Sequence, residues 1–356
     1  MTLDEMTPRE RFNAIRGNKK PDRMPIRLMF NSACGVMYGM TFREVFSSPR
    51  NYAKCQIAAY KRYGYDNVNA SYVGHSIGVA LGAKLTWPEN SHSFISEFPI
   101  QSPADLSCLD LDKTTLEKDI TAQQSFEVCE ILLSALGDEV EVGIAFPGPG
   151  TAAASLVGTE TFLRWTTRFP EQAKKLLEFS MLAVKNISLP FLRLGIVPSI
   201  SDPVATGAIM GKRRYEEFIF PYTKQIFSYW KEYGDQIYGY HVCGDTTAVL
   251  PMMAESGTGD ISLDNRVSLL TASETVGNVV ALSGNIDPVS IIRDGSSTEI
   301  DSAIAKAYKD CRNNPKGFTL SSGCGIPIGT PLEKLDTFME TAKYYAAKYA
   351  CTEDDA

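Results

Sequence analysis

The sequence predicts an α/β fold, a closed (β/α)8 TIM barrel, from three observations. Short apolar, β-branched segments alternate with longer amphipathic segments along the whole chain, as they do in α/β proteins. Eight short segments can be counted, and eight such units favour a closed barrel over an open doubly wound sheet. No fixed-period repeat or low-complexity segment interrupts the alternation, which excludes solenoids and propellers.

Each of the eight short segments predicts one strand of the barrel. Consecutive strands that are separated by helices pair in parallel through right-handed crossovers. The predicted strands cover residues 24–30, 67–71, 139–146, 197–202, 237–244, 260–264, 279–287 and 317–325.

The longer segments carry apolar residues at steps of three and four, which is the period of an amphipathic helix. At the amino end, Thr7, Pro8 and Glu10 have the order of an N-cap, a first-turn proline and a capping-box acid. This helix precedes the first strand, so residues 1–23 are predicted to form an N-terminal helical extension at the bottom of the barrel. The predicted helices cover residues 7–16, 50–63, 125–136, 170–194, 213–233 and 297–311.

The chain is predicted to form a single TIM-barrel domain over residues 1–356, because no linker rich in Pro, Gly or Ser divides it. The segment 72–113, between the second and third strands, is long and contains several turn residues. It is predicted to be an elaborated loop over the barrel mouth, where the functional loops of such barrels lie. A very small second domain in this segment is the alternative.

The composition excludes several classes of protein. Hydrophobic residues make up 44% and charged residues 22% of the 356 residues, which is typical of a globular chain and not of a disordered or collagen-like one. The 35 Lys and Arg residues are outnumbered by 42 Asp and Glu residues, so nucleic acid is not expected as a partner. No signal-like segment and no apolar run of roughly 18 residues is present. A cytoplasmic monomer or homodimer that does not bind membranes is expected.

Polar side chains gather where the predicted strands end. In a (β/α)8 barrel, the carboxyl ends of the strands form the active-site face. We therefore expect these residues to converge on one site. They are Asp202, His241, Cys243, Asp264, Asn285, Asp287 and Cys324.

Three of these residues predict a metal site. His241 and Cys243 are two residues apart, so on a strand both side chains point to the same face. Cys324, at the end of the eighth strand, is predicted to join them across the barrel mouth. One imidazole and two thiolates suit Zn²⁺ and leave a fourth position open, as in a catalytic zinc site. A His-x-Cys tripeptide alone arises readily by chance, but the adjacent glycines (Gly244, Gly323 and Gly325) and the strand-end positions favour the metal site.

Two acids at strand ends are candidate catalytic residues, and each has an alternative role. Asp264 is predicted either to supply an oxygen ligand to the metal or to orient His241 by accepting a hydrogen bond. Asp202 is predicted either to hold a polar group of the substrate or to cap the turn before Pro203.

Other cysteines are predicted to be packing or loop residues, as is usual for thiols in a reducing compartment. Cys55, Cys129 and Cys311 fall in predicted helices. Cys34 follows the first strand and is the other thiol that could reach the barrel mouth. It is assigned to the core or to a loop.

Several stretches of the sequence resemble one known family. The opening, with TPRERF at residues 7–12 and PDRMPI at 21–26, is similar to the start of the uroporphyrinogen decarboxylase superfamily. Asp202, the segment Tyr215–Tyr222 (YEEFIFPY) and residues 240–246 (YHVCGDT) resemble that superfamily as well. The resemblance extends over essentially the whole chain and implies a (β/α)8 barrel of the uroporphyrinogen decarboxylase type.

Within this superfamily, the sequence resembles the zinc-dependent methylcobalamin:coenzyme M methyltransferases. Residues 322–333 contain the GCG and GTPLE elements of that branch, whereas residues 27–39 lack the Arg-rich signature of uroporphyrinogen decarboxylase itself. The resemblance implies zinc ligands at His241, Cys243 and Cys324. Asp264 stands where that branch often has a glutamate.

The resemblance also implies an activity. It predicts a methyltransferase that moves a methyl group from a methylated corrinoid, such as methylcobalamin, to a thiol such as coenzyme M, with zinc activating the thiol as thiolate. The chain has no corrinoid-binding Asp-x-His-x-x-Gly segment, so the corrinoid is expected on a separate corrinoid protein. Three alternatives stay open: a tetrapyrrole decarboxylase, a corrinoid methyltransferase with a folate acceptor, and a non-catalytic partner of a corrinoid protein.

Overall fold

A computed structural model describes residues 4–16, 19–72 and 75–351. Residues 1–3 and 17–18 of the predicted N-terminal extension lie outside the described residues, as do residues 73–74 of the predicted loop.

The main sheet has seven strands in the order β1-β4-β5-β6-β7-β8-β9, which is also their order along the chain. This order is that of a (β/α)8 barrel, in which each strand pairs with the next along the chain. Each strand overlaps a segment that the sequence predicts to be a strand. The strands are β1 (Val68–Asn69), β4 (Val142–Pro147), β5 (Val197–Ser201), β6 (Gly239–Val242), β7 (Asp260–Leu263), β8 (Ala281–Ile286) and β9 (Phe318–Ser322).

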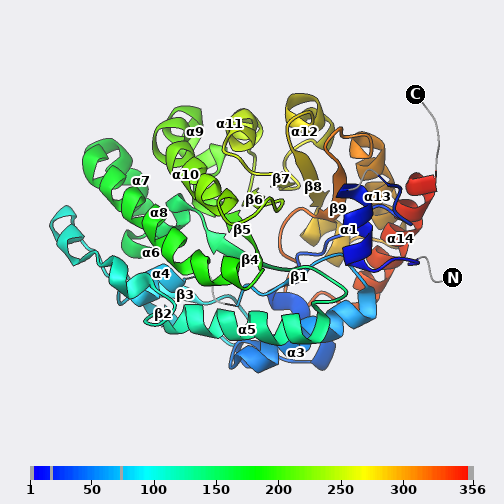
Figure 1. The fold of residues 1–356 in the computed structure, drawn as a ribbon, viewed down its shortest axis with the longest axis horizontal. Coiled ribbons are helices and arrows are strands. Elements are labelled where there is room, and N and C mark those ends of the chain that lie inside the picture. Colours follow the sequence, from blue (N-terminus) through cyan, green and yellow to red (C-terminus); the bar gives the residue numbers. More distant parts are fainter. Residues whose placement is uncertain (1–3, 17–18, 73–74, 352–356) are drawn as a thin grey trace. The chain divides into compact units, whose positions relative to one another are not determined.

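Helices alternate with these strands, as predicted (Figure 1). The first one begins as the sequence predicts, because Thr7 and Glu10 form a reciprocal capping box. No helix in the described part of the chain is long and apolar enough to cross a membrane. The longer helices are α1 (Pro8–Arg16), α3 (Pro49–Tyr63), α5 (Ile120–Leu136), α6 (Pro149–Val157), α7 (Thr159–Arg168), α8 (Pro170–Arg193), α9 (Gly207–Arg214), α10 (Phe220–Lys231), α12 (Leu269–Val276), α13 (Ser297–Cys311) and α14 (Leu332–Cys351).

The chain divides into two compact units. Unit 1 comprises residues 1–69, 130–142 and 262–356, and unit 2 comprises residues 70–129 and 143–261. Unit 1 therefore holds the first and last elements of the chain together with the short segment 130–142, and unit 2 holds the rest of the middle. That residues 1–356 behave as a single domain stays a prediction.

In unit 1, the predicted first strand, residues 24–30, is reduced to one bridge between Ile26 and Leu320 of β9. The N–H of Arg27 donates to the carbonyl of Leu320 at 2.8 Å, and the N–H of Leu320 donates to the carbonyl of Pro25 at 3.2 Å. Proline has no N–H to extend the pairing, which is why the strand is so short. The bridge still joins the beginning of the chain to the last strand of the sheet.

A buried ion-pair cluster lies beside this bridge. Arg11 of α1 and Arg23 have fully buried side chains, and both bind the fully buried carboxylate of Asp66. Asp66 also accepts the N–H of Ile26 at 2.6 Å. The cluster thus ties the first helix and the first strand segment to the residues that lead into β1.

Asp22 and Asp4 supply further partners for the two arginines. Asp22 accepts from Nε and Nη2 of Arg11 at 2.7 and 2.8 Å, and Asp4 accepts from Nε of Arg23 at 2.5 Å. Burial alone would raise the pKa of Asp22, but the hydrogen bonds and charge of Arg11, together with backbone N–H donors, lower that pKa to about 2.

In unit 2, strands β4, β5 and β6 pair in parallel. Helices α6, α7 and α10 pack against the long helix α8. Trp230 of α10 is fully buried, and its indole N–H donates to the hydroxyl of Ser188 in α8 at 2.8 Å. Phe227 of α10 also packs its ring against Tyr240 of β6, so this helix supports the strand that contains His241 and leads into Cys243.

The predicted helix 213–233 is interrupted in the structure. A π-helical turn, Tyr215–Ile219, lies between α9 and α10. Pro221 stands at the start of α10 and cannot donate the regular helical hydrogen bond, so the ladder is broken at this point.

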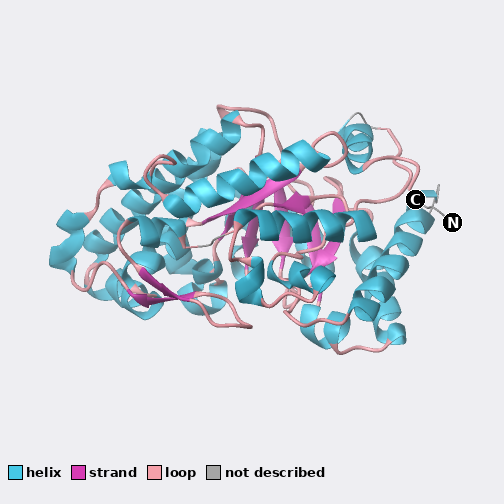
Figure 2. Cartoon of the chain, turned by 90° about the horizontal axis from the view of Figure 1, so that it is seen from below, coloured by secondary structure: helices cyan, strands magenta, loops and turns pink. Residues whose placement is uncertain are grey.

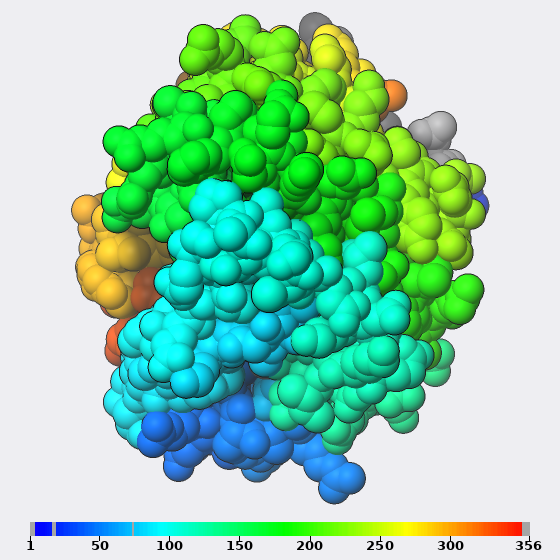
Figure 3. Space-filling model, turned by 90° about the vertical axis from the view of Figure 1, so that its left-hand side faces the viewer, coloured from blue at the N-terminus to red at the C-terminus, as the bar shows by residue number. Residues whose placement is uncertain are grey.

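The segment 72–113, predicted to be a loop, contains regular structure. It forms a short helix α4 (Ser76–Ala80) and an antiparallel hairpin of β2 (Lys84–Thr86) and β3 (Phe94–Glu97), separate from the main sheet (Figure 2). Its surface, cyan in Figure 3, lies beside the green surface of the helices that follow β4. Sequence patterning missed the hairpin because its strands are short and largely exposed. Its position over the barrel mouth stays a prediction.

The ion-pair cluster predicts how stability depends on pH. The pKa of Asp22 is lower in the folded protein, so its carboxylate stabilises the fold above about pH 4, and this contribution is lost as the pH falls towards about 2. We expect Asp22→Asn to lower the free energy of unfolding by about 3 kcal/mol at pH 7 and to flatten its decline in acid. Urea denaturation across this pH range measures both effects.

Asp138, an exposed acid of unit 1, provides the control for this measurement. Asp138→Asn should change neither the stability nor its pH dependence. If Asp22→Asn declined in acid as steeply as the wild type, the role given to Asp22 would be wrong.

Candidate metal centre

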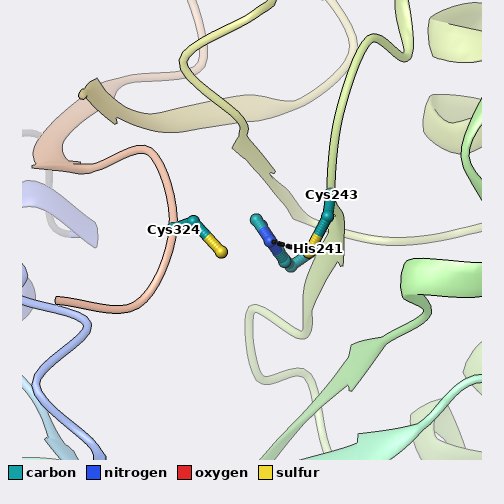
Figure 4. Close-up of side chains that lie close together, drawn as sticks. All are labelled: His241, Cys243 and Cys324. Carbon is teal, nitrogen blue, oxygen red and sulfur yellow. Dashed lines mark hydrogen bonds between the residues drawn. The ribbon is translucent and has the colours of Figure 1, made fainter. Parts of the chain in front are cut away.

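Two predicted ligands come from β6 of unit 2. His241 lies in the strand and Cys243 directly after it, so the strand's alternation places both side chains on one face. Nε2 of His241 and Sγ of Cys243 are 3.3 Å apart, marked by the dashed line in Figure 4. The imidazole is buried, with 7% of the residue exposed. The structure therefore brings these two predicted ligands together.

The backbone around β6 explains the glycine that follows Cys243. Gly244 has a φ of 80°, in the left-handed region, where a side chain is unfavourable. A Cβ at this position would also lie 2.9 Å from Oγ1 of Thr206. Gly244 thus lets the chain turn sharply after Cys243 and pack against the start of α9.

The third predicted ligand, Cys324, belongs to unit 1 and lies two residues after the end of β9. Its loop is closely packed on both sides. The N–H of Gly323 donates to the carbonyl of Ile286 at 2.8 Å, and that of Ile326 donates to the carbonyl of Met29 at 3.0 Å. A Cβ on Gly323 would lie 2.5 Å from the backbone nitrogen of Asn265, so glycine is required beside Cys324.

Asp264, also in unit 1, follows β7 and is buried. Its Oδ1 accepts the N–H of Arg266 at 2.9 Å, and its carbonyl accepts from Nδ2 of Asn285 at 3.0 Å. These bonds fix the turn that presents the carboxylate. Whether Asp264 binds a metal or orients His241 stays a prediction.

Asp202 follows β5 and is fully buried. Its carboxylate accepts hydrogen bonds from residues at the start of helix α6. It accepts from the N–H of Gly150 at 3.0 Å, and from the N–H and the hydroxyl of Thr151 at 2.8 and 2.6 Å. Burial raises the pKa of Asp202 to about 6, although these hydrogen bonds oppose the shift. These contacts tie Asp202 to residues 51 and 52 positions earlier in the chain, and the N–H of Ala205, in the turn that begins at Pro203, also lowers its pKa. Whether Asp202 holds a polar group of the substrate or caps that turn stays a prediction.

Two positioning residues were not predicted. Asn265 packs against Gly323 and donates from Nδ2 to Asp287 at 3.0 Å. Thr151 holds Asp202, as described above. The position of Asn265 directly after Asp264 was the signal that could have identified it, whereas no local pattern marks Thr151.

The match to a protein family covers almost the full length of the chain. A family model described as uroporphyrinogen decarboxylase (URO-D) matches residues 7–345. The chain belongs to the uroporphyrinogen decarboxylase family.

The relatives of the chain include several methyltransferases. The methylcobamide:CoM methyltransferase MtbA of Methanosarcina acetivorans is 37% identical over 147 residues, which is 41% of each chain. The methylcobamide:CoM methyltransferase MtaA of Methanosarcina barkeri (strain Fusaro) is 23% identical over 357 residues, covering 97% of this chain and all of the relative. A solved structure of a methyltransferase from Methanosarcina mazei has a TM-score of 0.82 at 21% identity, covering 96% of this chain and 99% of that one.

These comparisons confirm two predictions. The fold is the (β/α)8 TIM barrel of the uroporphyrinogen decarboxylase type. The resemblance to the methylcobalamin:coenzyme M methyltransferase branch is also confirmed, since relatives with that activity in their names match the chain.

The contacts of Asp202 predict a loss of stability on mutation. In Asp202→Asn, the side-chain amide cannot accept from all three donors, so we expect the free energy of unfolding to fall by about 2–3 kcal/mol. Thr151→Val removes one hydroxyl donor and should cost about 1 kcal/mol. Urea denaturation at pH 7 measures both variants. An Asp202→Asn variant with wild-type stability but impaired activity would instead support the substrate-binding role.

Proposed function

We propose that this chain is a zinc-dependent methyltransferase that moves a methyl group from a methylated corrinoid to the sulfur of a thiol such as coenzyme M. The observation that carries the proposal is the His241–Cys243 pair at the carboxyl end of β6. It occurs in a chain that matches a methylcobamide:CoM methyltransferase over 97% of its length. Active sites of (β/α)8 barrels lie at this end of the strands.

The donor atoms of β6 fit zinc. Zinc binds histidine nitrogen at about 2.0–2.1 Å and thiolate sulfur at about 2.3 Å, so a tetrahedral ion holds such a pair about 3.6 Å apart. The observed separation of Nε2 and Sγ is 3.3 Å. A soft sulfur donor beside an imidazole also favours zinc over magnesium or calcium.

Cys324 is proposed as the third ligand. Within the described ranges, its thiol is proposed to complete a three-ligand metal site with the His241–Cys243 pair. Three protein ligands would leave one position for the acceptor thiol, as in catalytic zinc sites. Bound there, zinc would supply the positive charge that keeps a thiol deprotonated near neutral pH.

The protein's own residues would orient and enclose the reacting groups. The carbonyl of His241 accepts the N–H of Asp202 at 2.9 Å, which holds the imidazole-bearing strand in register with β5. Asp264 is proposed to act at the same centre, either on the ion or on His241. Burial of His241 and Asp264 limits the access of water, which strengthens electrostatic interactions in the site.

The methyl donor is proposed to be a corrinoid carried by a separate corrinoid protein. The relatives named above act on a methylcobamide, and this sequence has no corrinoid-binding segment of its own. A small thiol is proposed as acceptor, with a folate as the alternative. A tetrapyrrole decarboxylase is the second candidate, because the matching family model bears that description, but residues 27–39 contain a single arginine to bind substrate carboxylates.

Metal analysis tests the site. We expect about one zinc per chain in the purified protein, and less than about a tenth of that in His241→Ala, Cys243→Ser and Cys324→Ser, because loss of one of three ligands opens the site. Elemental analysis by mass spectrometry gives the stoichiometry. His75→Ala and Cys311→Ser are the matched controls and should keep their zinc.

The outcome for Cys324→Ser is the most informative. Full zinc content in this variant, with loss in the other two, would show that Cys324 is not a ligand. Absence of zinc from the wild-type protein after purification with added zinc would contradict the proposed centre.

An activity assay tests the reaction itself. With methylcobalamin and coenzyme M, the wild-type protein should form methylated thiol at a rate that falls at least about 100-fold in Cys243→Ser, because the thiol then stays largely protonated. Loss of the methylcobalamin absorbance measures the rate. Decarboxylation of a porphyrinogen by the protein, without methyl transfer, would decide for the alternative.

A further inference from the structure

Two thiols of unit 1, distinct from the candidate metal ligands, lie next to each other. Cys34 belongs to a 3-10 helix, η1 (Ser32–Tyr38), and Cys55 belongs to α3. Both residues are fully buried, and their thiols lie close enough for each to shift the pKa of the other. Both are free cysteines. The sequence assigns them only to core or loop positions, so their proximity arises from the fold.

The backbone around the pair holds η1 against α3. Nε2 of Gln56, the residue after Cys55, donates to the carbonyl of Phe30 at 2.7 Å. Sγ of Cys55 donates to Sδ of Met40 at 3.7 Å, and the N–H of Met40 donates to the carbonyl of Gly35 at 3.0 Å. These contacts keep the two thiols adjacent while the protein is folded.

The two thiols differ in acidity. The hydrogen bond from Cys34, with a smaller contribution from the charge of Lys54, lowers the pKa of Cys55. Burial, together with the interaction with Cys55, raises the pKa of Cys34 well above its usual value. The interaction between the two thiols therefore favours ionisation of Cys55 over ionisation of Cys34.

We propose that Cys34 and Cys55 are a redox pair that forms a reversible disulfide when the protein meets a peroxide. The Cys55 thiolate attacks a peroxide oxygen, so that an S–O bond forms, the O–O bond breaks and hydroxide leaves. The Cys34 sulfur then attacks the Cys55 sulfur, so that the S–S bond forms, the S–O bond breaks and water leaves with the proton of Cys34. The two thiols lose two electrons, and one hydrogen peroxide becomes two waters.

The chemistry of the surroundings favours a disulfide over a bound metal ion. A monovalent metal ion on two thiolates would leave a net negative charge in a fully buried place, which is unfavourable. A disulfide is uncharged and fits an apolar core. The buried position also means that oxidation requires local opening of η1, so we expect it to be slower than that of the exposed Cys108.

The pair lies close in sequence to a segment that supports the loop of Cys324. The N–H of Met29 donates to Oγ of Ser322 at 3.4 Å, and its carbonyl accepts the N–H of Ile326 at 3.0 Å. A disulfide would fix the chain just beyond Met29 to α3. Oxidation of the pair would then restrain the segment that supports the Cys324 loop and leave the thiol of Cys324 itself unmodified. The inference does not depend on the proposed methyltransferase activity.

Peptide mapping of the full-length protein tests the proposal. Reduced protein is treated with hydrogen peroxide, blocked with N-ethylmaleimide in denaturant, and digested with trypsin without reductant. Trypsin places Cys34 in peptide 28–43 and Cys55 in peptide 55–61. We expect these two peptides to appear joined, lighter by two hydrogens than their sum, and to separate after treatment with dithiothreitol.

The same peptide mapping can also contradict the proposal. If both peptides carry N-ethylmaleimide at peroxide doses that oxidise Cys108, or if Cys34 or Cys55 is instead joined to another cysteine, the pair is not the redox pair proposed. Peptides 232–266 and 317–334 report Cys243 and Cys324 separately, so oxidation of the candidate metal ligands cannot be mistaken for the proposed reaction.

Variants test the order of the two steps. In Cys34→Ala, we expect the sulfenic acid of Cys55 to persist and to be trapped by dimedone, because the resolving thiol is absent. In Cys55→Ala, no dimedone adduct should form on Cys34. Cys311→Ala, another buried helical cysteine, should form the 34–55 disulfide as the wild type does. An adduct on Cys34 in Cys55→Ala would contradict the assigned order.

Discussion

The carboxylate of Asp66 is the constraint on which the architecture of unit 1 depends. It lies between two fully buried arginines, Arg11 and Arg23, and accepts hydrogen bonds from both. Unpaired buried charges are strongly destabilising, so each member of such a cluster requires the others. The first helix and the first strand segment are therefore held in place by one acid that follows α3.

This constraint reaches the last strand of the sheet. Asp66 accepts the N–H of Ile26, and Ile26 bridges to Leu320 of β9. Three residues after Ile26, Met29 bonds to Ser322 and Ile326 on either side of Cys324. The short stretch of chain from Ile26 to Met29 thus links the ion-pair cluster to the loop of a candidate metal ligand. The two arginines belong to the opening motif that carries the family resemblance, and the cluster gives that motif a physical reason.

The sequence predicted most strands of the fold because their apolar runs are local signals. Strand β4, with the sequence VGIAFP, is one continuous run of this kind. The hairpin of β2 and β3 gave no such signal, since exposed strands need no apolar alternation. The break at Pro221 inside a predicted helix was missed because the amphipathic period continues through it. Patterning reports which face is buried, and it does not report the hydrogen bonds of the backbone.

The candidate site was predictable where its chemistry is local, and not where it depends on distant partners. The spacing of His241 and Cys243 is sufficient to place both on one face of a strand. The carboxylate of Asp202, by contrast, bonds to Gly150 and Thr151, which only the folded chain brings near. Two buried thiols, Cys34 and Cys55, illustrate the same limit, because their 21-residue separation carries no pattern.

The alternation of β6 explains why a histidine and a cysteine separated by one residue suit this position. Tyr240, which precedes His241, is fully buried and its hydroxyl lies 3.1 Å from that of Tyr215. Tyr240 therefore faces the helices outside the sheet, and Val242 lies on the same face of the strand. A strand in this place must offer apolar or aromatic residues to the helices at every second position. The positions between them are free of that demand, and these are the positions that His241 and Cys243 occupy.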